Sequence, residues 1–166
     1  MHNVVQLLAR ATAIVGGFVL VGLVILTTVS TAGRELGIGE VNGSYEILEA
    51  GVAFAIFSFF PICQLHGAHA TVDIFTLRLP VRGQRMIAAF WEVVLTAALI
   101  LISWRLYEGM LRYLGNGETT LFLQFPVWWG YACSFGASVA TCIVGLYCAA
   151  MRVGESITGR ILLPVV

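Results

Sequence analysis

The sequence predicts an all-α integral membrane protein, one domain with four transmembrane helices over residues 1–166. Of these residues 59% are hydrophobic and only 11% are charged, far from the composition of a soluble domain. The apolar residues lie in four blocks of about 20 residues, the length that a helix needs to cross about 30 Å of hydrocarbon. They do not alternate with polar residues as barrel strands do, so a helical bundle is expected.

The four spans are expected at about residues 11–30, 45–65, 86–107 and 127–151, and the third helix continues to about 114. The first block is N-terminal and follows Arg10, as a cleaved signal peptide would. Its apolar core exceeds the roughly 7 to 15 residues of a signal sequence and no small-x-small cleavage site follows, so we expect it to remain. The mildly amphipathic run from Ile74 to Pro80 is expected to lie along the cytoplasmic membrane surface.

The basic residues, which are all arginine, predict the orientation. Two lie in the connections after the first and third spans, Arg34 and Arg112, with Arg105 near the end of the third helix. The other six gather on the opposite side: Arg10, Arg78, Arg82, Arg85, Arg152 and Arg160. Because arginine concentrates on the cytoplasmic side, both termini are expected in the cytoplasm and the two short connections outside.

Charge and cysteine usage exclude several functions. The formal net charge is zero and the arginines form no cluster, so a nucleic-acid partner is not expected. The four cysteines lie inside apolar segments without a C-x-x-C pair, which favours ordinary packing over redox catalysis or a disulfide. We expect no enzyme and no catalytic residue.

The fourth span carries small residues at intervals of four. One row is Gly130, Ser134, Ser138 and Cys142, and a second is Cys133, Ala137, Thr141, Gly145 and Ala149. A shorter row in the first span is Ala9, Ala13 and Gly17. Small side chains let helix backbones approach closely in lipid, so the fourth helix is expected to contact protein over a wide arc. The alternative is that small residues are simply frequent in membrane helices.

Glu92 lies well inside the third span, where an acid requires a partner. It shares a small and polar face with Arg85, Ala88, Ala89, Thr96 and Ser103, which should point into the bundle. Arg85 lies two turns back, about 10 Å along the axis, so either both side chains reach toward each other or an arginine from another segment approaches Glu92. We favour a paired, structural Glu92 over a proton or cation relay, because no second ionisable residue continues such a path.

Other residues mark the ends of the spans. Five aromatic residues are expected as anchors at the outer interface and Trp91 at the inner one: Trp104, Tyr107, Trp128, Trp129 and Tyr131. Glu46 and Glu49 either pair with an arginine or simply favour the N-terminus of the second helix, with Ser44 as its N-cap. A metal site at His66, His69 and Asp73 is not expected, because no fourth ligand is near.

The order of these features resembles the small membrane subunit of TRAP transporters, the DctQ-type family. The matching motifs are Glu46, Gly67-x-His69-x-x-Val72-Asp73, Leu79-Pro80 and Pro126-x-Trp128-x-x-Tyr131, with Arg34 as a loop arginine. The sequence departs from the family at Gln64-Leu65-His66, where arginines often precede the glycine. This departure weakens the expectation that the corner binds anionic lipid.

The resemblance implies a scaffold subunit in a bacterial inner membrane. Its partners would be a DctM-type large permease subunit, which carries the substrate and sodium sites, a periplasmic substrate-binding protein and membrane lipids. The cargo would be an organic acid, and no cofactor beyond bound lipid is expected in this chain. The residues expected to serve structure or partner contacts are Arg34, Glu46, Glu49, His69, Asp73, Arg78, Arg85, Glu92, Gly130, Ser134 and Ser138.

Two other functions stay open at the level of sequence. A small homodimeric four-helix transporter would use Glu92 as its site, but such proteins are usually shorter and carry the acid in their first helix. A haem-binding electron carrier needs histidine pairs across helices, and no histidine lies inside a predicted span. The scaffold interpretation is preferred because no span is broken by a Gly-Pro interruption, which a transport path of this class would normally show.

Overall fold

The computed structural model describes residues 2–67 and 81–158, and within these ranges it contains four long helices and no strand. The helices are α1 (His2–Glu35), α2 (Ser44–Leu65), α3 (Val81–Asn116) and α4 (Trp128–Thr158). Each is long and apolar enough to cross a membrane, which confirms the predicted fold class. The expected surface segment at 74–80 lies outside the described residues, as do His69, Asp73 and Arg78.

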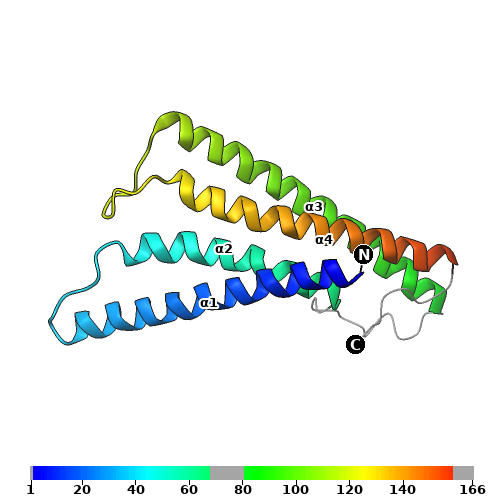
Figure 1. Ribbon diagram of the computed structural model, residues 1–166, viewed down its shortest axis with the longest axis horizontal. Coiled ribbons are helices and arrows are strands. Elements are labelled where there is room, and N and C mark those ends of the chain that lie inside the picture. The colour runs from blue at the N-terminus through cyan, green and yellow to red at the C-terminus, as the bar shows by residue number, and fades with distance from the viewer. Residues whose placement is uncertain (1, 68–80, 159–166) are drawn as a thin grey trace.

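The helices form two hairpins that lie side by side, α1 with α2 and α3 with α4 (Figure 1). The hairpins meet where α2 packs against α4, and α1 also contacts α4. The lateral order is therefore α1, α2, α4, α3, and α4 is the helix whose backbone comes close to the other three. We call the end with connections 36–43 and 117–127 the loop end, and the opposite end, where α1 begins, the terminal end.

Small residues explain the central place of α4. Both predicted rows are largely buried, with Ser134, Ala137, Ser138, Thr141, Gly145 and Ala149 enclosed by neighbouring helices. A β-carbon at Gly130 would lie 3.1 Å from the β-carbon of Ala50, so α4 approaches α2 closely there. Cys133 was expected to contact a neighbouring helix as part of the second row, but it is exposed.

The first helix packs through a single narrow stripe. Its buried residues recur every seven positions, at Ala9, Gly16, Leu23 and Ser30, while large apolar residues such as Phe18 point away and are up to 72% exposed. A β-carbon at Gly16 would come within 2.7 Å of the Ser58 β-carbon, whereas Gly17 has open space. The small-residue contact predicted at Gly17 is thus wrong by one residue, because the seven-residue repeat selects Gly16.

Candidate functional site

Several polar side chains of the bundle form hydrogen bonds from one helix to another. Within residues 2–67 and 81–158, no group of three or more His, Cys, Asp or Glu side chains is placed to hold a metal ion. The polar contacts occur at three levels: near the terminal end, in the middle of the bundle and at the loop end.

Glu92 meets its partner where α2, α3 and α4 come together. The side chain of Gln64 is only 1% exposed, and its Nε2 donates to Glu92 Oε1 at 3.1 Å and to Thr96 Oγ1 at 3.3 Å. Thr96 in turn donates to the backbone carbonyl of Gly145 at 3.3 Å. One amide therefore connects α2 to α3, and one hydroxyl connects α3 to α4.

Gly145 makes room for this amide. A β-carbon there would lie 2.9 Å from Gln64 Nε2 and 3.1 Å from Gln64 Oε1. The amide thus lies directly against the α4 backbone, and its Oε1 is buried with no hydrogen-bond partner in the described part of the chain. Gln64 was not among the partners expected for Glu92, although it is the single amide in the apolar run of the second span.

A proline inside α2 creates the second contact. Pro61 has no backbone N–H, so the carbonyl of Phe57, four residues earlier, loses its normal helical partner. Thr141 of α4 donates its hydroxyl to that carbonyl at 2.8 Å. A membrane helix tolerates proline when a neighbouring Ser or Thr satisfies the freed carbonyl, so Thr141 allows α2 to continue unbroken.

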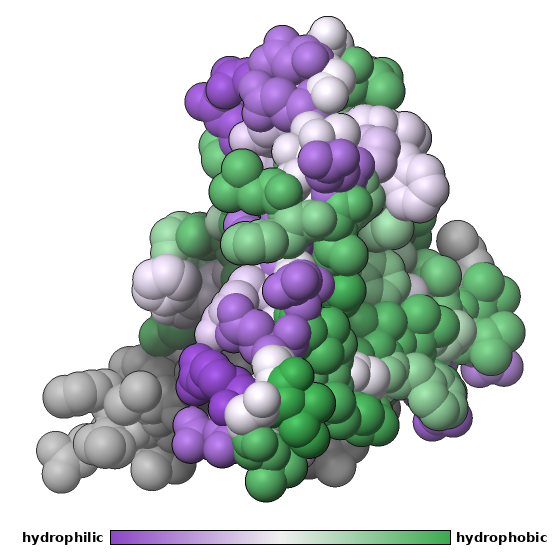
Figure 2. Space-filling model, turned by 90° about the vertical axis from the view of Figure 1, so that its left-hand side faces the viewer, coloured by the Kyte–Doolittle hydropathy of each residue, from purple (hydrophilic) through white to green (hydrophobic). Residues whose placement is uncertain are grey.

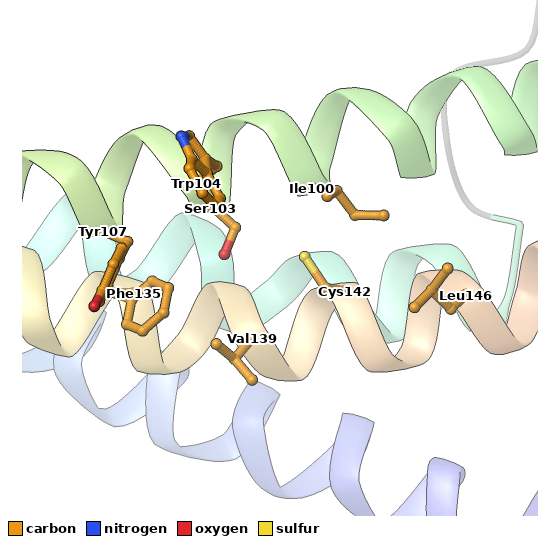
Figure 3. A pocket seen from close by; sticks show the side chains of 8 residues that line it. All are labelled: Ile100, Ser103, Trp104, Tyr107, Phe135, Val139, Cys142 and Leu146. Carbon is orange, nitrogen blue, oxygen red and sulfur yellow. The ribbon is translucent and has the colours of Figure 1, made fainter.

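Two serines join α3 to α4 nearby. Ser103 Oγ and Ser138 Oγ are 2.9 Å apart, and Ser138 also donates to the Phe135 carbonyl at 2.8 Å, so Ser103 is the donor between the two. Beside this pair the two helices form an open apolar groove of about 470 Å³ (Figure 3). Its other lining residues are Ile100, Trp104, Tyr107, Phe135, Val139, Cys142 and Leu146.

At the loop end, Glu46 binds the connection between α3 and α4. Its carboxylate accepts the backbone N–H of Phe122 at 2.8 Å and that of Leu123 at 3.1 Å. Gly43 lies beneath Leu123, and a β-carbon on it would be 2.5 Å from Leu123 Cγ. Glu46 was expected to pair with an arginine or to favour a helix terminus, and its bonds to a distant loop were not foreseen.

The N-terminus of α2 corrects another prediction. Gly43, in the left-handed region at φ 77°, is the N-cap residue, and no side chain caps the helix there. Ser44 is the first helical residue, and its Oγ bonds Ser30 Oγ of α1 at 3.3 Å. The assignment of Ser44 as N-cap is therefore wrong, because this hydroxyl joins two helices instead.

The remaining predicted residues lie at the helix ends and on the outer faces. Arg34 and Glu49 are exposed at the loop end, and Arg85 is half-buried near the start of α3. Trp104 donates its Nε1–H to Glu108 at 2.9 Å, and Arg105 bonds the same carboxylate. Of the predicted anchors, Trp91, Trp104, Tyr107 and Trp129 are exposed, while Trp128 and Tyr131 are half-buried.

Fold and contacts together define a four-helix membrane protein whose internal polar groups connect helices. The family model described as "Tripartite ATP-independent periplasmic transporters, DctQ component" matches residues 23–153. The chain belongs to this family, whose members are the small permease subunits of TRAP transporters, and the resemblance seen in the motifs is confirmed. Among curated proteins no relative is found for this sequence.

Proposed function

We propose that this chain is the stationary scaffold of its transporter. It would anchor the large permease subunit in the bacterial inner membrane during sodium-coupled uptake of an organic acid delivered by a periplasmic binding protein. The observation that carries the proposal is the chain of hydrogen bonds from Gln64 through Thr96 to Gly145, which joins three helices inside the membrane.

A scaffold has to resist deformation while a neighbouring subunit moves. Direct bonds between α2, α3 and α4, together with side chains that pack closely on the α4 backbone at Gly130 and Gly145, oppose sliding of one helix past another. The amide of Gln64 occupies Glu92 Oε1, which supports a structural acid rather than a relay. Large apolar side chains on the outer faces of α1 and α3 suit contact with lipid and with a partner subunit.

The orientation proposed for this scaffold follows the arginine distribution. Both termini would lie in the cytoplasm, and the loop end would face the periplasm, where Arg34 and Glu49 are exposed to a binding protein. Lipid would cover the remaining apolar surface.

Co-purification and transport test the proposal together. We expect the chain, expressed with the large permease subunit of its transporter, to purify with that subunit in fixed stoichiometry. In liposomes, uptake of organic acid should require both subunits, a sodium gradient and the binding protein. Uptake catalysed by this chain alone would refute the scaffold role.

Two substitutions at Glu92 separate structure from relay. Glu92→Gln keeps an oxygen that accepts from Gln64, so assembly and uptake should both stay near the unsubstituted level. Glu92→Leu removes that acceptor, so the stability of the complex should fall and uptake should fall with it. If Glu92→Gln abolished uptake while the complex stayed intact, a relay through Glu92 would replace the scaffold proposal.

A further inference from the structure

The turn at residues 121–123 exposes large apolar side chains at the loop end. Leu121 is 88% exposed and Phe122 is 71% exposed, although neither lies on a membrane-spanning helix. Figure 2, which faces this end, shows hydrophobic surface interleaved with hydrophilic patches. An apolar tip held in one conformation marks a surface that contacts something other than water.

The length of α2 fixes the depth of this turn. The 22 residues of α2 span about 33 Å, barely more than the roughly 30 Å of hydrocarbon that the helix crosses. Its first turn must therefore lie at the boundary between headgroups and acyl chains. Because Glu46 of that first turn bonds the backbone of Phe122 and Leu123, the 121–123 turn lies at the same depth.

Several backbone N–H groups in and beside the turn have hydrogen-bond acceptors within the protein, which suits a poorly hydrated environment. Besides the two N–H groups bound by Glu46, Thr120 donates its N–H to the Phe125 carbonyl at 3.0 Å. Phe125 donates its N–H to Thr120 Oγ1 at 3.3 Å. Backbone groups that are satisfied internally lower the cost of leaving water, while Leu121 and Phe122 gain from meeting lipid.

The connection between α1 and α2 provides an internal contrast. It also exposes an apolar residue, Ile38, at 82%. However, Ser30 of α1 is level with Ser44, and α1 runs on to Glu35, about 7.5 Å further along its axis. This connection reaches beyond the 121–123 turn (Figure 1), so Ile38 lies outside the depth fixed by α2.

We infer that the 121–123 turn is an interfacial membrane anchor. It inserts Leu121 and Phe122 among the lipids at the headgroup boundary, and Glu46 holds it at that depth from α2. Its neighbours at this level, Tyr45 and Trp129, are exposed aromatic residues of the kind that favour the same boundary. The anchor needs no partner subunit, so it does not depend on the scaffold proposal.

Photocrosslinking in the assembled transporter tests this inference. Phe122→benzoylphenylalanine places a photoreactive ring at the turn, and Ile38→benzoylphenylalanine is the matched control in the other connection. After illumination in liposomes of phosphatidylethanolamine and phosphatidylglycerol, intact mass spectrometry should find one added phospholipid as the main product at 122 and not at 38. Equal lipid addition at both positions, no lipid addition at 122, or a main crosslink to the large subunit or binding protein would overturn the inference.

A second comparison tests the part of Glu46. In the chain labelled at 122, Glu46→Ala removes both acceptors and should lower lipid addition by about threefold or more, whereas exposed Glu49→Ala should not. Glu46→Gln keeps one acceptor and should give an intermediate yield, which guards against misfolding of the alanine variant. Equal yields in the Glu46 and Glu49 variants would show that Glu46 does not set the depth.

Discussion

The first and fourth helices are both long apolar segments, yet they occupy opposite environments. Helix α4 contacts the other three helices and buries much of its length, whereas α1 packs through one stripe and exposes residues such as Phe18. The difference lies in how far around the helix the small residues extend, since α4 has two rows of them, whereas α1 has one stripe and carries Val, Leu and Phe on its other faces. Apolar side chains place a helix in the membrane, and small side chains let it pack in the interior of the helix bundle.

Gly145→Leu should break the interior of α4 most severely. The added side chain would occupy the space of the Gln64 amide and Thr96 hydroxyl, so α2, α3 and α4 could not pack together at this point. We expect a loss of about 3 kcal/mol or more in the free energy of unfolding, measured by denaturant titration in detergent. Gly136→Leu is the control on the same helix, because open space surrounds Gly136, and it should change stability little.

Gly16→Leu tests whether α1 depends on its one stripe. A side chain there would collide with Ser58 of α2, so the first hairpin should loosen at a cost of about 2 kcal/mol. The neighbouring Gly17→Leu enters open space and should be tolerated. Equal thermal stability of these two variants would contradict the seven-residue contact stripe.

Thr141→Val removes a hydroxyl and preserves the volume of the side chain. The Phe57 carbonyl, already deprived of its helical donor by Pro61, would lose its replacement, and stability should fall by about 1 kcal/mol. Thr28→Val is the control on α1, because its hydroxyl bonds within its own helix at Val24. A similar decrease in stability in both variants would show that the hydrogen bond between Thr141 and Phe57 contributes no more than one within a single helix.

Ser103→Ala should give the smallest effect. It removes the donor to Ser138, a bond of the kind that contributes about 0.6 kcal/mol within membranes. Ser156→Ala near the end of α4 serves as the control, since that hydroxyl bonds the Val153 carbonyl of the same helix. In thermal unfolding, the loss of stability in Ser103→Ala should be smaller than that in Thr141→Val and larger than that in the control Ser156→Ala.

The sequence predicted the helices well because solid apolar runs determine insertion by themselves. It also predicted the wide contact arc of α4, since small residues at intervals of four have few other uses in lipid. It did not predict the lateral order of the helices, which depends on how two hairpins associate. It placed the α1 contact at Gly17 instead of Gly16 because it followed a spacing of four, whereas α1 packs on α2 with a repeat of seven.

The polar contacts were harder to predict, because their partners are distant in sequence. Gln64 and Glu92 lie on different helices, and Glu46 bonds a loop 76 residues later, at Phe122. Arginine was the partner expected for these acids, and the structure adds an amide and two backbone N–H groups as donors. An acid within an apolar span can thus be matched by any good donor that the fold brings near.

The hydroxyl of Thr141 has a consequence for biosynthesis. During translation α2 enters the membrane well before α4 has been made, so the Phe57 carbonyl faces lipid without its later donor. The hydrogen bond that satisfies the Phe57 carbonyl therefore forms only after α4 has been made and packs against α2. A chain truncated before Thr141 would leave the Phe57 carbonyl in the bilayer without this hydroxyl as its donor.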